Sequence, residues 1–266
     1  MDFFSGGSDA GTLGLGLLIA GAAAGLFSGL LGRGAGLILV PALYQVAEQL
    51  GVATAVRFPL AAGTSLACLL PLSLNMAAHH AKALNPSEVK QALPFVAMGL
   101  VLGMAGLFLF PAMLREIFFG LFALAVVVVT FWASRSKRVD RFVAKTGAAQ
   151  TMAGLITGTT GIALALSSNT LPSRKASEAL AWFIAIAVTA IGAVLAVVMG
   201  WNAEGLPKYS YGFFNLLGFG IVAPVMFATS AVAAHYRYGV DAKRLIGPFA
   251  IVVVITTGKM LWDALG

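Results

Sequence analysis

The chain has 266 residues, of which 59% are hydrophobic and only 10% are charged, with a formal net charge of +7. A soluble globular domain carries roughly 25% charged residues, so this composition excludes that class and predicts a polytopic membrane protein. In such a protein the positive charge belongs to loops that flank the spans, so nucleic-acid binding is not expected. A single cysteine, Cys68, lies in an apolar run and rules out an intrachain disulfide.

A membrane-spanning helix needs about 20 mostly apolar residues. Eight stretches meet this requirement: 11–31, 59–79, 91–110, 116–134, 147–169, 178–200, 212–235 and 245–264. Segment 37–50 is apolar at its start and polar at its end, and is either a re-entrant half-helix or a short, tilted ninth span. The sequence therefore predicts an all-α, polytopic integral membrane protein with about eight to nine transmembrane helices, of the kind found in a bacterial inner membrane.

A basic loop divides the chain into similar halves. Residues 134–145 include five positive side chains, which places this loop in the cytoplasm: Arg135, Lys137, Arg138, Arg141 and Lys145. Residues 25–32 resemble 154–161, and residues 120–123 resemble 247–250, at offsets of 129 and 127. We expect a first membrane repeat at 1–133, a linker at 134–146 and a second repeat at 147–266. Duplicated halves are typical of secondary transporters, which hold the substrate where the repeats meet.

The densest group of glycines follows the first predicted span. Gly21, Gly25 and Gly29 have the four-residue spacing that lets membrane helices pack closely. Gly32, Gly34 and Gly36 alternate instead and are followed by Pro41. Alternate glycines favour a break in the helix, and a helix that restarts after a break directs free N–H groups and its positive dipole end at a bound anion. The alternative is that these glycines also serve packing.

Arg33 lies within this glycine segment. A guanidinium near the hydrocarbon region costs about 3 kcal/mol on insertion scales, so it needs a partner or water. Its planar fork suits bidentate oxyanions such as sulfonate or carboxylate. The alternative is that Arg33 lies at the membrane surface and anchors the topology.

Neutral polar side chains supply further candidates for binding an anion. In the first half they belong to Thr64, Ser65 and Asn75. In the second half they follow the repeated glycine motif and belong to Thr157, Thr160, Ser167, Ser168 and Asn169. Taken singly, hydroxyls in membrane helices commonly bond only the backbone one turn back. As a cluster opposite the glycine break, they would donate hydrogen bonds to an oxyanion.

Residues 25–41, then Ala62-Gly63-Thr64-Ser65, then Leu114-Arg115 with Phe119-Gly120, resemble the TauE/SafE family of sulfite and organosulfonate exporters. The resemblance implies transport of sulfur-containing anions such as sulfite, thiosulfate or organosulfonates. It also implies a glycine-rich motif ending in proline in each repeat, which Gly32, Gly34, Gly36 and Pro41 match. Ala35 replaces one glycine of that motif, and Arg33 stands where an apolar residue is usual. The second motif has lost its later glycines and its proline.

The expected function is secondary transport of a small anion by alternating access. The alternatives are an anion channel, or a non-transporting membrane subunit whose glycines only pack helices. His79 ends a predicted span and is either solvated at the interface or couples protons. No enzyme motif and no metal-ligand spacing is present in the sequence, so we expect neither catalysis nor a cofactor. The expected partners are a small anionic substrate and membrane lipid, and a homo-oligomer is left open.

Overall fold

The fold is helical, in agreement with the sequence. A computed structural model describes residues 7–31, 34–80, 82, 86–135, 174–236 and 242–265. The helices are α1 (Gly7–Leu31), α2 (Ala35–Gln49), α3 (Thr54–His80), α4 (Pro86–Leu109), α5 (Ala112–Arg135), α7 (Arg174–Met199), α8 (Leu216–Tyr236) and α9 (Ala242–Leu265). Seven of the predicted spans correspond to helices, and the eighth, 147–169, lies outside the described residues. Six of these helices are long and apolar enough to cross a membrane: α1, α3, α4, α7, α8 and α9. The prediction of an all-α polytopic membrane protein is confirmed.

The connection between α7 and α8 forms a small antiparallel hairpin. Strand β1 (Ser210–Tyr211) pairs with β2 (Phe214–Asn215). The predicted span 212–235 therefore starts too early, because residues 212–215 belong to the hairpin. Helix α8 begins at Leu216 because the Asn215 side-chain oxygen accepts a hydrogen bond from the Gly218 N–H at 2.7 Å, as an N-cap does.

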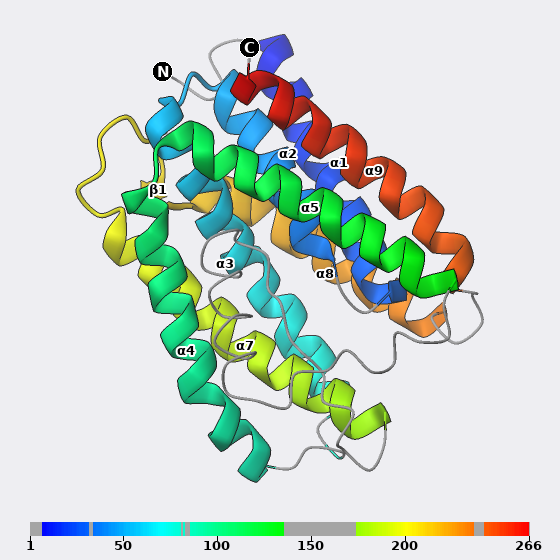
Figure 1. The fold of residues 1–266 in the computed structure, drawn as a ribbon. Helices are drawn as coiled ribbons and strands as arrows, with labels where there is room; N and C mark the ends of the chain where they lie inside the picture. Colours follow the sequence, from blue (N-terminus) through cyan, green and yellow to red (C-terminus); the bar gives the residue numbers. More distant parts are fainter. Residues whose placement is uncertain are drawn as a thin grey trace.

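The helices run between two ends of the molecule. At the end that carries the hairpin, here called the hairpin end, α2, α4 and α7 finish and α3, α5 and α8 begin (Figure 1). Gly63 of α3 lies against Ala196 of α7, and Gly192 of α7 lies against Leu66 of α3, so these two helices are antiparallel. Helices α5 and α9 also lie side by side in opposite directions (Figure 1). The opposite end holds the finish of α3, α5 and α8.

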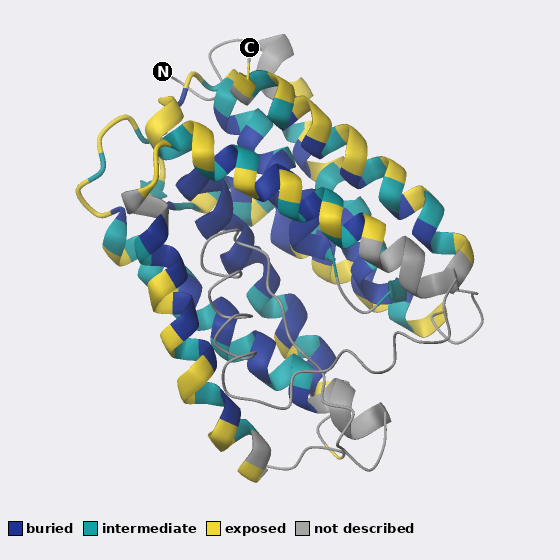
Figure 2. Cartoon of the chain, in the orientation of Figure 1, coloured by how far each residue is buried: buried dark blue, intermediate teal, exposed yellow. Residues whose placement is uncertain are grey.

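Helix α3 occupies the centre of the structure. In its apolar stretch 78% of the residues are buried, against 28–39% in the other five candidate spans. The outer helices leave large apolar side chains exposed, as the yellow patches along α5 and α9 indicate (Figure 2). Leu121, Val128, Ile251 and Ile255 are each more than 60% exposed. A surface of this kind fits surrounding lipid rather than water.

Helices α1 and α8 run parallel along a seam of small residues. Gly21 of α1 faces Val222, Gly25 faces Met226 and Thr229, and Gly29 faces Ser230 and Ala233. At each of the three glycines, a Cβ atom would meet the backbone of α8. The predicted packing role of this glycine series is therefore confirmed.

Candidate functional site

Residues 37–49 of the ambiguous segment 37–50 belong to a short helix, and Leu50 directly follows it. Helix α2 has 15 residues, which gives a length of about 22 Å, less than the roughly 30 Å of a bilayer core. Its first seven residues, 35–41, are all buried, Gly36 and Pro41 among them. A helix that starts inside the protein is tolerated in a membrane only where protein or a cavity surrounds the break.

Gly34 makes the break before α2. Its φ of 99° and ψ of 0° lie in the left-handed region, which glycine adopts readily and other residues do not. The ring of Phe249 from α9 lies directly over Gly34, and it also contacts the Phe27 ring of α1 edge to face, with centroids 5.4 Å apart. The Leu37 N–H donates to the Gly34 carbonyl at 3.1 Å. The N–H groups of Ala35 and Gly36 have no acceptor within the helix, because they belong to its first turn.

The two predicted hydroxyls on α3 differ in their contacts. The Thr64 hydroxyl accepts a hydrogen bond from the Asn215 N–H at 3.0 Å, so it helps to fix the start of α8. Thr64 and Asn215 also line a cavity of about 30 Å³ whose remaining walls are mostly apolar, which is room for about one water molecule. The Ser65 hydroxyl is fully buried and has no hydrogen-bond partner among the described residues.

Asn75 lies about 15 Å further along α3 than Ser65, since a helix rises about 1.5 Å per residue. Its side-chain nitrogen is buried and has no hydrogen-bond partner within the described part of the chain. Helices α2 and α3 are antiparallel: Ala47 packs with Leu60, and Leu43 lies across from Thr64. Continuing this register places Gly34 level with residue 73, so Asn75 lies at the depth where α2 starts.

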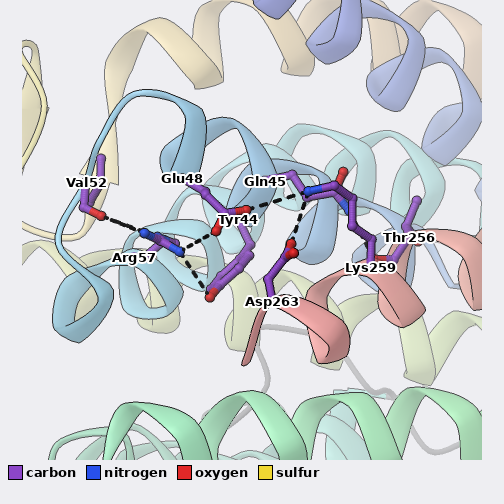
Figure 3. Close-up of polar contacts among 8 residues, drawn as sticks. All are labelled: Tyr44, Gln45, Glu48, Val52, Arg57, Thr256, Lys259 and Asp263. Atoms are coloured by element: carbon purple, nitrogen blue, oxygen red, sulfur yellow. Dashed lines mark hydrogen bonds and ion pairs between the residues drawn. The ribbon is translucent and has the colours of Figure 1, made fainter. Parts of the chain in front are cut away.

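A cluster of charged and polar side chains surrounds the other end of α2 (Figure 3). Arg57 of α3 donates to Glu48 at 2.8 Å, and the pair is largely shielded, with side chains 14% and 28% exposed. Arg57 also donates twice to the Val52 carbonyl, at 3.2 and 3.3 Å, and to the Tyr44 hydroxyl at 3.4 Å. These bonds close the turn between α2 and α3.

The same cluster ties α2 to α9 in the second half of the chain. Gln45 donates to the Thr256 carbonyl at 3.0 Å. Lys259 lies 3.6 Å from Glu48 and 3.0 Å from Asp263, which is four residues later on the same helix (Figure 3). The polar end of segment 37–50 thus forms bonds to both halves of the chain.

Helix α5 adds Arg115 and Glu116 to this end. Pro59 of α3 has no N–H, so the Ala55 carbonyl one turn earlier lacks its usual helical partner. Arg115 donates to that carbonyl at 3.0 Å. Glu116 is only 1% exposed, and the Tyr44 hydroxyl donates a hydrogen bond to its carboxylate.

Glu48, Arg57 and Glu116 are not among the site residues predicted from the sequence. The sequence holds a signal for Glu116, because it is an acidic residue at the first position of the predicted span 116–134. Seven of the predicted binding residues lie outside the described residues: Gly32, Arg33, Thr157, Thr160, Ser167, Ser168 and Asn169. His79 lies in the last turn of α3, and its side chain is not described.

The described helices define a multi-pass membrane protein. The predicted break within a helix is instead a reversal of direction, because α1 runs away from the hairpin end and the short helix α2 runs back toward it. The chain belongs to the sulfite exporter TauE/SafE family, whose model matches residues 17–260, so it is a membrane transport protein by family. A "Probable membrane transporter protein" of Haemophilus influenzae is 26% identical over 256 residues, which covers 91% of this chain and 96% of the relative. No solved structure matches this chain.

Proposed function

We propose that this protein is a secondary transporter of small sulfur-containing anions such as sulfite, thiosulfate or organosulfonates. The observation that carries the proposal is the buried start of α2, which follows Gly34 in a left-handed conformation. Free N–H groups and the positive end of a helix dipole favour an anion. The family is described as sulfite exporters, which supports a substrate that contains sulfur.

The proposed binding site combines this helix start with neutral donors. Asn75, level with Gly34, has a buried amide nitrogen that no described residue engages. A buried polar group without a partner is costly, and an oxyanion would supply the missing acceptor. Gly36 and Pro41 lie buried in the first two turns of α2. The proposed site also includes Arg33 and, from the second half, four hydroxyls and one amide: Thr157, Thr160, Ser167, Ser168 and Asn169.

Alternating access is the proposed mechanism, since the helix directions support two inverted repeats. Helices α4 and α8 begin 130 residues apart (216 − 86), as do α5 and α9 (242 − 112), and α3 and α7 begin 120 apart (174 − 54). In inverted repeats, equivalent helices run in opposite directions across the membrane, as α3 and α7 do. The proposed repeats are residues 1–133 and 147–266.

The proposed location is a bacterial inner membrane with loop 134–145 in the cytoplasm. Helix α5 ends at Arg135, so this loop leaves the end of the molecule opposite the hairpin. Lys82, Arg174 and Lys175 also lie at helix boundaries of that end. Lys and Arg concentrate on the cytoplasmic side of membrane proteins.

The test is binding of sulfite, thiosulfate, taurine, sulfoacetate, acetate and chloride by purified protein in detergent. Wild type is compared with Arg33→Gln, Asn75→Leu and, as a control on the exposed end of α8, His235→Gln. We expect saturable binding of one sulfur oxyanion, weakened by the first two changes only. Binding that neither change weakens would contradict the site, and flux through vesicles without saturation would indicate a channel.

A further inference from the structure

Glu116 is a buried acid that does not belong to the proposed anion site. Its side chain lies near the start of α5, and one of its carboxylate oxygens, Oε1, is buried with no hydrogen-bond partner in the described residues. Burying an ionised carboxylate is expensive unless every lone pair is engaged. Ionisable residues inside membrane proteins often serve proton pathways for this reason.

The charges around Glu116 come from each helix that packs near it. Arg57 of α3, Arg115 of α5 and Glu48 of α2 act on its carboxylate, and Tyr44 of α2 is bonded to it. Beyond Glu48, α9 contributes Lys259 and Asp263. The three bases and three acids sum to zero while Glu116 is ionised and to +1 once it is protonated.

Resting on the proposed transport function, we propose that Glu116 binds and releases the proton that couples anion movement to the proton gradient. Oε1 of the carboxylate accepts one proton to give the neutral acid, and the acid later returns that proton to water. No other bond changes. Protonation leaves the cluster at the finish of α2, which includes Arg57 of α3, with a net charge of +1. This charge favours entry of an anion at the hairpin end, the opposite end of α2 from the proposed anion site.

A proton suits this position better than a metal ion. Calcium takes six to eight oxygen ligands and magnesium about six, whereas Glu116 offers one unpartnered oxygen. Arg57 and Arg115 would repel a metal cation at that point. Among the described residues, no group of three or more His, Cys, Asp or Glu side chains could hold a metal ion.

The experiment uses proteoliposomes and ³⁵S-labelled thiosulfate, with wild type, Glu116→Gln and Glu204→Gln. Glu204→Gln is the matched control, since it makes the same chemical change at an exposed position in the α7–β1 connection. Exchange of internal for external thiosulfate needs no net proton movement. Accumulation driven by an imposed pH difference does need net proton movement. A difference of about one pH unit can sustain about tenfold accumulation per coupled proton.

We expect Glu116→Gln to keep exchange but to lose accumulation, while Glu204→Gln keeps both. Accumulation by Glu116→Gln equal to wild type would overturn the proton site and leave the transport proposal intact. Absence of exchange in the wild type would instead overturn thiosulfate transport.

A second measurement needs neither substrate nor transport. Infrared difference spectra between acidic and alkaline pH should show a protonated-carboxyl band in wild type and Glu204→Gln that Glu116→Gln lacks. If Glu116→Gln fails to fold, Tyr44→Phe removes the hydroxyl bonded to the carboxylate and should shift this band. A band that neither variant changes would overturn the proposal.

Discussion

Gly34 combines a left-handed backbone with a close aromatic neighbour. A Cβ atom there would lie 2.8 Å from the Phe249 ring, and the left-handed region costs other residues about 1–2 kcal/mol. We therefore expect Gly34→Ala to lower the free energy of unfolding by at least about 1 kcal/mol. Thermal unfolding in detergent measures this. Gly247→Ala on α9 is the control, because nothing lies within 4 Å of its Cβ position. Equal melting temperatures for both variants would contradict the geometry.

Arg57 and Lys259 both contact Glu48 but differ in exposure. The Arg57 side chain is 14% exposed and that of Lys259 is 50% exposed. Because a shielded pair that loses one partner leaves an uncompensated charge, Arg57→Gln should destabilise the protein by about 3 kcal/mol. Lys259→Gln should cost less than about 1 kcal/mol. Denaturation of both variants in detergent checks the contrast, and adding Glu48→Gln to Arg57→Gln should recover part of the loss. A similar cost for the two substitutions would show that burial does not set the strength of these pairs.

At the scale of elements, the α1–α8 seam depends on the absence of side chains. A Cβ atom at Gly25 would meet the backbone of Met226 and the side chain of Thr229, and the helix backbone cannot move aside locally. Gly25→Ala should therefore separate the two helices and reduce the fraction of protein that elutes as a single species in size-exclusion chromatography. Gly14→Ala on the same helix has open space around it and should elute like wild type. Normal elution of Gly25→Ala would mean that the seam opens at little cost.

The sequence predicts the helices better than it predicts the contacts between them. Runs of about 20 apolar residues located seven helices, because spanning length is a local property. Segment 37–50 stayed ambiguous, because its length alone does not distinguish a half-helix from a tilted span. The burial of Glu116 could not be predicted from the sequence, for a different reason. Its burial depends on α2 and α3 packing over the start of α5, and no local pattern encodes that arrangement.

For the whole molecule, the helix directions and the distribution of charge predict which end faces which side. Asn202 lies at the hairpin end, and Lys82 follows α3 at the opposite end. With buried Cys68 changed to Ser, Asn202→Cys should react with a membrane-impermeant maleimide added to intact cells, because the proposed orientation places the end opposite the hairpin in the cytoplasm. Lys82→Cys should react only after the cells are broken. The reverse pattern would invert the proposed orientation.

The duplicated sequence predicted two halves but not the way in which they interlock. In the proposed repeats, offsets near 130 residues would pair the corresponding helices, but they say nothing of which helices touch. In the structure, α1 of the first half packs along α8 of the second, and α3 packs against α7. Such pairings depend on side-chain shape across distant segments, as when Gly192 admits Leu66.

The parallel seam of α1 and α8 also has a consequence for biosynthesis. Gly25 contacts Met226, which the ribosome adds about 200 residues later. At about 5–20 residues per second, roughly 10–40 s pass before the partner of α1 exists. During that interval the glycine face of α1 must be covered by lipid, by an earlier helix or by the insertion machinery. Correct assembly of this protein is therefore decided late in translation, when α8 enters the membrane.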